Sequence, residues 1–150
     1  MADRSHDVAN AAERKRLLSL VARLSDEELS RPVSAGWTVA GALAHLAFWD
    51  QRIVVLLERW RREGTAAVPA PLDETNVDWI NDAAKPMLLA LPPRRAAELA
   101  VVIAEAVDRM VATLPDDLLA RNATAGTPVN LLRAQHRREH LDEIERALAS

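Results

Sequence analysis

Three of the four histidines in the chain occupy positions from which they could bind one metal ion. His136 and His140 are spaced i, i+4, so in a helix both rings lie on one face about one turn apart and can chelate a single ion. His45 lies in an earlier predicted helix and can point at that pair across a bundle. Three neutral nitrogen ligands with one open position are typical of a catalytic zinc-type site.

The predicted surroundings of the histidine pair favour a buried position. If the last helix opens with Thr127 as cap and Pro128 at its first position, the pair lies on a narrow core-facing stripe. That stripe consists of Val129, Leu132, His136, His140, Glu143 and Ala147, whereas Arg137 and Arg138 fall on the solvated face. A buried imidazole requires a hydrogen-bond partner or a metal. The alternatives are an accidental pair with a solvated second histidine, and a hydrogen-bonded His45 at the core boundary.

Four further residues are candidates for the surroundings of the site. Asp50 interrupts an apolar stripe and could either pair with an arginine across the bundle or support a metal-bound histidine from outside. Trp49 is either a core residue or a pocket wall. Arg133 precedes His136 by one helical turn and could hold a substrate carboxylate. Glu143 could close the site as a fourth ligand, but three histidines are preferred because a fourth bond leaves no place for a thiol or water.

A second motif overlaps the same helix. Residues 136–140 match H-x-x-E-H, a pattern of zinc peptidases in which the glutamate is the general base. Glu139 would lie off the histidine stripe, and only ten residues follow His140. The match is therefore interpreted as a coincidence in a helix rich in Glu and Arg.

Composition excludes several classes of function. The 150 residues fit one domain (1–150), and 49% apolar with 27% charged residues is an ordinary globular balance. A net charge of −3 argues against a nucleic-acid surface, which needs a concentrated basic face. The chain has no cysteine, so disulfides, Cys-ligated metals and protein thiol nucleophiles are excluded. A charged N-terminus and the lack of a long uninterrupted apolar run predict a cytoplasmic protein that does not enter a membrane.

The pattern predicts an all-α protein that positions these residues on four long helices. The segment 65–75 contains two prolines and is not expected to be helical, and an extended chain from Glu63 to Thr75 could span roughly 40 Å, the height of a bundle. The helices on either side of it would then be parallel. The resulting order is up-down-down-up rather than simple alternation. A long loop is expected over 116–126, and a stripe of Leu99, Ile103, Val107, Met110 and Leu114 is expected to be buried. Helices are predicted over about 7–24, 38–62, 76–84 (broken near Pro86), 93–114 and 127–148, with a capping box at 25–28.

Two segments resemble the signatures of the DinB-like (YfiT-type) superfamily. Residues 36–39 (GWTV), 44–47 (AHLA) and Asp50 resemble its second helix, and residues 136–141 (HRREHL) with Ile144 resemble its last helix. The resemblance implies a four-helix bundle, often a homodimer, with zinc or nickel held by His45, His136 and His140. It also implies relatedness to bacillithiol S-transferases and mycothiol-dependent maleylpyruvate isomerases, although the additional C-terminal domain of the isomerases is missing here.

The leading hypothesis is a metal-dependent enzyme that activates a low-molecular-weight thiol or water and acts on a small-molecule substrate. The sulfur would arrive with the cosubstrate, because the protein has none in cysteine. One alternative is a non-catalytic bundle that binds or sequesters a small molecule or a metal. Another is a structural homodimer with a vestigial site.

Overall fold

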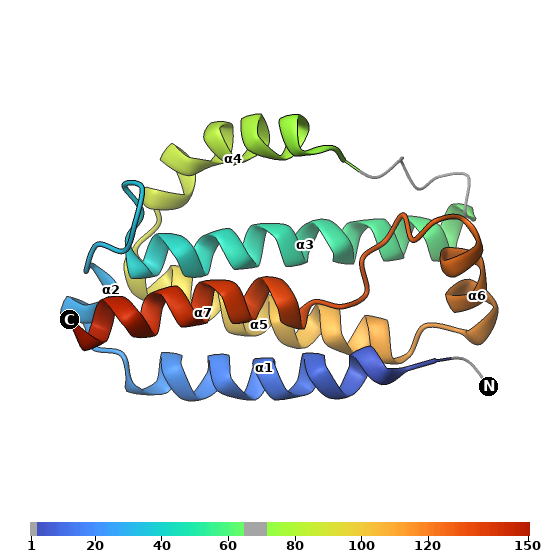
Figure 1. Cartoon of the computed structure of the whole chain (residues 1–150), viewed down its shortest axis with the longest axis horizontal. Coiled ribbons are helices and arrows are strands. Elements are labelled where there is room, and N and C mark those ends of the chain that lie inside the picture. The colour runs from blue at the N-terminus through green and yellow to red at the C-terminus, as the bar shows by residue number, and fades with distance from the viewer. Residues whose placement is uncertain (1–2, 65–71) are drawn as a thin grey trace.

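Four long helices lie side by side along the molecule (Figure 1). The computed structural model describes residues 3–64 and 72–150, and in that part of the chain the named elements are all helices, without a strand. The long helices are α1 (Ser5–Arg23), α3 (Val39–Glu63), α5 (Pro93–Ala112) and α7 (Ala134–Ala149). Three further helices join them: α2 (Asp26–Leu29), α4 (Glu74–Leu89) and α6 (Asp116–Thr124).

The directions of the helices follow from the colour gradient of Figure 1. Helices α1 and α7 run from right to left, and α3 and α5 run from left to right. Helix α3 packs most extensively against α5, and α1 packs against both α5 and α7. Helix α4 lies on the outside of α3 and runs antiparallel to it. The chain therefore returns to the start of the bundle largely through α4, and α5 then runs parallel to α3.

Helix α3 is the central helix and begins and ends as its sequence predicts. The Thr38 hydroxyl accepts a hydrogen bond from the Gly41 amide, and the helix stops at Gly64, whose φ of 85° suits glycine. By length and apolarity α3 could cross a membrane, but 78% of its most apolar window is buried inside the bundle, as in the core helix of a soluble protein. The predicted capping box opens α2, where Ser25 and Glu28 exchange hydrogen bonds.

The buried face of α5 combines a row of alanines with larger apolar residues nearer its C-terminal end. Val107 and Leu114 of the predicted stripe are fully buried, whereas Leu99, Ile103 and Met110 are only half-buried. The buried face of α5 is shifted toward a row of alanines, because small side chains let two helix backbones approach closely. That row consists of Ala96, Ala97, Ala100 and Ala104.

Two expectations for the middle of the chain are wrong, the end of one helix and the position of a loop. Helix α4 is not broken at Pro86 but continues through it to Leu89. Pro86 is exposed, so the carbonyl that it leaves without a partner can be hydrated. The expected loop 116–126 is largely helix α6, and of the expected linker 65–75, residues 65–71 lie outside the described part of the chain.

The last helix begins later than expected, at Ala134 rather than at Pro128. The preceding residues are held in a non-helical path by two buried asparagines. Asn122 pairs with both backbone groups of Val129 (2.9 and 3.1 Å). Asn10 of α1 donates to the Leu131 carbonyl and accepts from the Ala134 amide, both at 2.9 Å. These amides replace the helical hydrogen bonds of the segment, so α7 starts where Asn10 caps it.

Candidate metal centre

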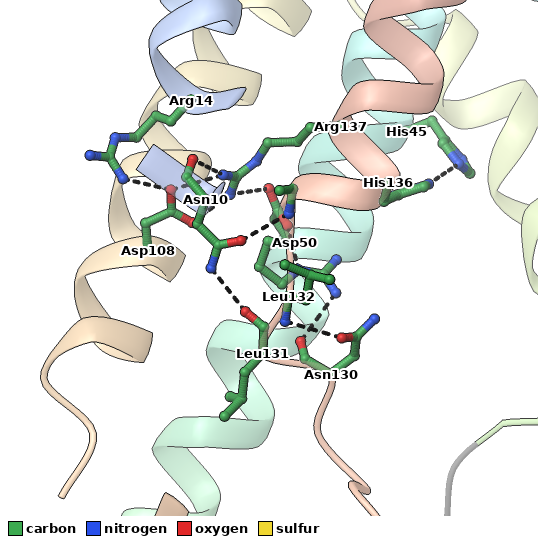
Figure 2. A network of polar contacts seen from close by, with 12 residues as sticks. Asn10, Arg14, His45, Asp50, Asp108, Asn130, Leu131, Leu132, His136 and Arg137 are labelled. Carbon is green, nitrogen blue, oxygen red and sulfur yellow. Dashed lines mark hydrogen bonds and ion pairs between the residues drawn. The ribbon is translucent and has the colours of Figure 1, made fainter. Parts of the chain in front are cut away.

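The three histidines singled out by the sequence converge. His45 extends from α3, and His136 and His140 extend from the first turns of α7. One ring nitrogen of each lies within 4.8 Å of the others, and the Nε2 atoms of His45 and His136 are 3.1 Å apart (Figure 2). All three rings meet edge to face, with centroids 4.7–5.0 Å apart. The fold thus builds a compact group of three imidazoles.

Burial keeps the three imidazoles neutral at physiological pH. It lowers the pKa of His45 to about 4, with a further contribution from the charge of His140. Burial and then the neighbouring His140 and His45 lower the pKa of His136 to about 2. The pKa of His140 is also lowered by burial, although Glu143 opposes that shift. Neutral rings keep the lone pair that a metal ligand needs.

The geometry of the cluster fits a divalent ion. Metal–nitrogen bonds of about 2.0–2.1 Å in a tetrahedral arrangement place two ligand nitrogens about 3.3 Å apart, close to the 3.1 Å between His45 and His136. It is the Nε2 atoms of these two rings that face one another, whereas the Nδ1 atom of His45 is buried and has no hydrogen-bond partner among the described residues. The three-histidine group could therefore hold a metal ion.

Glu143, the expected rival ligand, lies at the edge of the cluster. Its carboxylate accepts a hydrogen bond from the Ser34 hydroxyl at 3.0 Å, and its other oxygen is 3.8 Å from His140 Nδ1, beyond hydrogen-bond distance. Within the described chain, no carboxylate belongs to the group whose ligand atoms converge.

Asp50 belongs to a buried charge network rather than to the histidines. Its carboxylate accepts from Arg133 Nε at 2.9 Å and from Arg137 Nη2 at 3.2 Å. Arg137 also forms a two-armed pair with Asp108 of α5 (2.7 and 2.8 Å), which Arg14 of α1 approaches at 2.6 Å (Figure 2). Of the two roles proposed for Asp50, the structure shows the pairing with arginines.

The expected solvated position of Arg137 is wrong. Arg137 is 1% exposed, and only Arg138, with 54% of its side chain exposed, lies at the surface as expected. Because α7 starts at Ala134, its buried face is rotated from the expected stripe. That face consists of Ala134, Arg137, Leu141 and Ile144, while the half-buried His136 and His140 border it and Leu132 is 39% exposed outside the helix.

The network fixes the first turns of α7 against three other helices. Arg137 contacts Asp50 of α3 and Asp108 of α5, and its Nη1 donates to the Asn10 carbonyl of α1. These contacts fix the rotation of α7 about its own axis, and with it the direction in which the neighbouring His136 points. Asn10 and Asp108 were not among the predicted site residues, and the only sequence signal for them is a polar residue at a buried helical position.

Two cavities meet at the histidines. One, of about 450 Å³, lies beside Trp37, Lys85 and Glu143, and the other, of about 360 Å³, lies beside Trp49, Arg52 and Arg133. His45, His136 and Asn81 line both. The indole nitrogen of Trp49 donates to Asn81 Oδ1 at 2.7 Å, which ties α4 to α3 between the cavities. Trp49 and Arg133 thus lie on a cavity wall.

Comparison with known proteins places the chain in a family. A model of the DinB superfamily matches residues 9–144, which covers both histidine-bearing helices. The chain belongs to the DinB superfamily. This confirms the resemblance seen in the sequence, and members of the DinB superfamily typically bind metal. Searches of curated proteins and of solved structures gave no significant match.

Proposed function

We propose that this member of the DinB superfamily is a metal-dependent enzyme that activates a low-molecular-weight thiol or water. His45, His136 and His140 would hold the ion, zinc or nickel. The observation that carries the proposal is the convergence of three neutral imidazoles at the junction of two cavities. A purely structural histidine cluster would not need access from a cavity.

The bound ion would supply Lewis-acid chemistry that lowers the pKa of a thiol or water at its open position. The chain contributes the neutral ligands, and it leaves the remaining position to a cosubstrate because no carboxylate or cysteine in the described residues joins the cluster. Arg137, through Asp50 and Asp108, would keep His136 oriented. Trp49 and Arg133 would contact the organic substrate in the smaller cavity.

The finer classification is part of the same proposal. A mycothiol-type S-transferase or isomerase, in which the cosubstrate brings the sulfur, is one form of the proposed activity, and a hydrolase that activates water is the other; a protein without cysteine is compatible with both. We also propose that residues 1–150 form one cytoplasmic domain with up-down-down-up order, which the helix directions in Figure 1 support, and that two copies associate as a homodimer.

The metal content and the turnover of the wild type and three variants test the proposal. Wild type, His140→Ala, Glu143→Ala and His6→Ala are loaded with zinc or nickel, analysed for bound metal, and assayed with a thiol and a panel of electrophiles. We expect His140→Ala to lose the metal and turnover, and Glu143→Ala to keep most of the metal. His6→Ala is the matched control because His6 lies outside the cluster.

Other results would select the alternatives. Stable metal binding without turnover of any electrophile would favour a bundle that binds or sequesters a metal or small molecule. If Glu143→Ala releases the ion as readily as His140→Ala, the site is closed and the enzymatic proposal is wrong. Failure of the wild type to take up metal would leave a structural protein with a vestigial site.

A further inference from the structure

The smaller of the two cavities has a basic wall beside the candidate metal centre. Arg52 of α3 and Arg133 line it together with His45 and His136, and none of its lining residues in the described chain is acidic. Trp49, Ile53, Val77 and Pro128 supply apolar surface in the same cavity. The cavity therefore combines positive charge at one part of its wall with surface for a small organic group.

The positive charge of this wall is not matched by the protein. Asp50 and Asp108 together serve three guanidinium groups, those of Arg14, Arg133 and Arg137. Two carboxylates cannot neutralise three buried or half-buried cations, so the network as a whole, to which Arg133 belongs, carries a net positive charge.

Arg52 adds a second cation at the same place. Among residues 3–64 and 72–150, no carboxylate oxygen lies within 4.0 Å of its guanidinium, and the sequence of residues 65–71 contains no Asp or Glu. Its guanidinium instead lies over the Trp49 ring, 5.8 Å from the centroid. Burial, and then the charge of Arg133, lower the pKa of Arg52 below its ordinary value.

We propose that Arg52 and Arg133 form the binding site for a carboxylate group of the substrate. The substrate would thus be a small carboxylic acid whose reactive part reaches the histidines that line the same cavity. That this acid is turned over there rests on the proposed function. Arginine pairs bind carboxylates well because each guanidinium offers several N–H donors in a planar fork.

The other cavity would not bind the same group. Its wall carries Asp82, Glu139 and Glu143, and its one lysine, Lys85, already donates to the Ala35 carbonyl. The excess of negative charge repels a carboxylate. An anionic substrate would therefore enter with one orientation, its carboxylate toward Arg52 and Arg133 and away from Glu143.

Binding of benzoate and of its neutral analogue benzamide tests the proposal without relying on turnover. Ligand-observed NMR titrations are made at about pH 7.5, where benzoate is ionised, on protein freed of metal with a chelator. We expect benzoate to bind at least about tenfold more tightly than benzamide, with an affinity that falls as salt is added. Arg52→Gln should weaken benzoate binding about tenfold and leave benzamide unchanged.

Two control variants show whether the anion binds in this cavity. Arg95→Gln removes an exposed arginine that pairs with Glu98 at the start of α5, and it should change neither affinity. His140→Ala removes a metal ligand but no residue of this cavity, so benzoate binding should persist in it.

Several results would overturn the proposal. These are equal affinities for benzoate and benzamide, no benzoate binding up to roughly 10 mM, or equal effects of Arg52→Gln and Arg95→Gln. Benzoate binding that appears only in metal-loaded wild type, and not in His140→Ala or metal-free protein, would place the anion on the ion and also overturn it. Failure of the wild type to bind zinc or nickel would overturn the proposed function alone, because the benzoate preference is measured without metal.

Discussion

Replacing Arg137 by leucine should lower the free energy of unfolding by about 3 kcal/mol. Removing one partner of a buried ion pair costs about 3–5 kcal/mol because the remaining charge is left buried without a partner. The lower end applies here, since Asp108 keeps Arg14 at 2.6 Å and Asp50 keeps Arg133 at 2.9 Å. For a domain of this size the loss corresponds to a decrease in Tm of about 6–12 °C.

Urea unfolding followed by far-UV circular dichroism measures this loss, and Arg138→Leu is its matched control. Arg138 is the next residue of the same helix, but it is more than half exposed, and within the described part of the chain its only ion pair is with Glu13 at 3.2 Å. Such a pair contributes about 0–1 kcal/mol, so Arg138→Leu should be close to wild type. Equal losses in the two variants, or a loss below about 1 kcal/mol for Arg137→Leu, would refute the structural role assigned to the network.

Three further predictions concern pH and the helix ends. Because His45 has a pKa of about 4 when folded and 6.5 as its ordinary value, the unfolded chain binds more protons below pH 6.5. His45 alone should therefore remove up to about 3 kcal/mol from the stability of the metal-free protein between pH 6.5 and pH 4, and the lowered pKa of His136 adds a further loss. Urea titrations should show a smaller loss over this range in His45→Gln than in wild type. Asn10→Ala should cost about 1–3 kcal/mol and weaken metal binding, because the Leu131 carbonyl and the Ala134 amide lose their buried partner; unchanged unfolding and zinc affinity would contradict this. Ser25→Ala should cost about 1 kcal/mol in the same unfolding assay without changing zinc affinity, since it removes only the cap of α2.

The sequence was sufficient for the features that local patterns control. Helical periodicity and end signals located α1, α3 and α5 to within a few residues, because capping groups and apolar spacing act over one or two turns. The i, i+4 spacing of His136 and His140 placed both rings on one side of α7. His45 was also assigned correctly to the convergent group, because it borders the apolar face of α3.

The errors at the last helix come from hydrogen bonding between residues far apart in the chain. The pattern Thr127–Pro128 is a good local helix start, but Asn10 and Asn122 bind the backbone of the following segment and delay α7 to Ala134. That delay changes which residues of α7 face the core, so Arg137 is buried where periodicity placed it in solvent.

The sequence by itself determined the helical class, the family, and the shared helix face of His136 and His140, since these depend on local patterns and on spacing along single helices. The tertiary structure decided that Asp50 serves Arg133 and Arg137, that Glu143 lies outside the cluster, and that Arg52 faces a cavity without an acidic partner. The reason is physical: a periodic pattern specifies the direction of a side chain around its own helix. The partner of a buried charge depends on the rotation and height of the helices packed against it, which only the assembled bundle fixes.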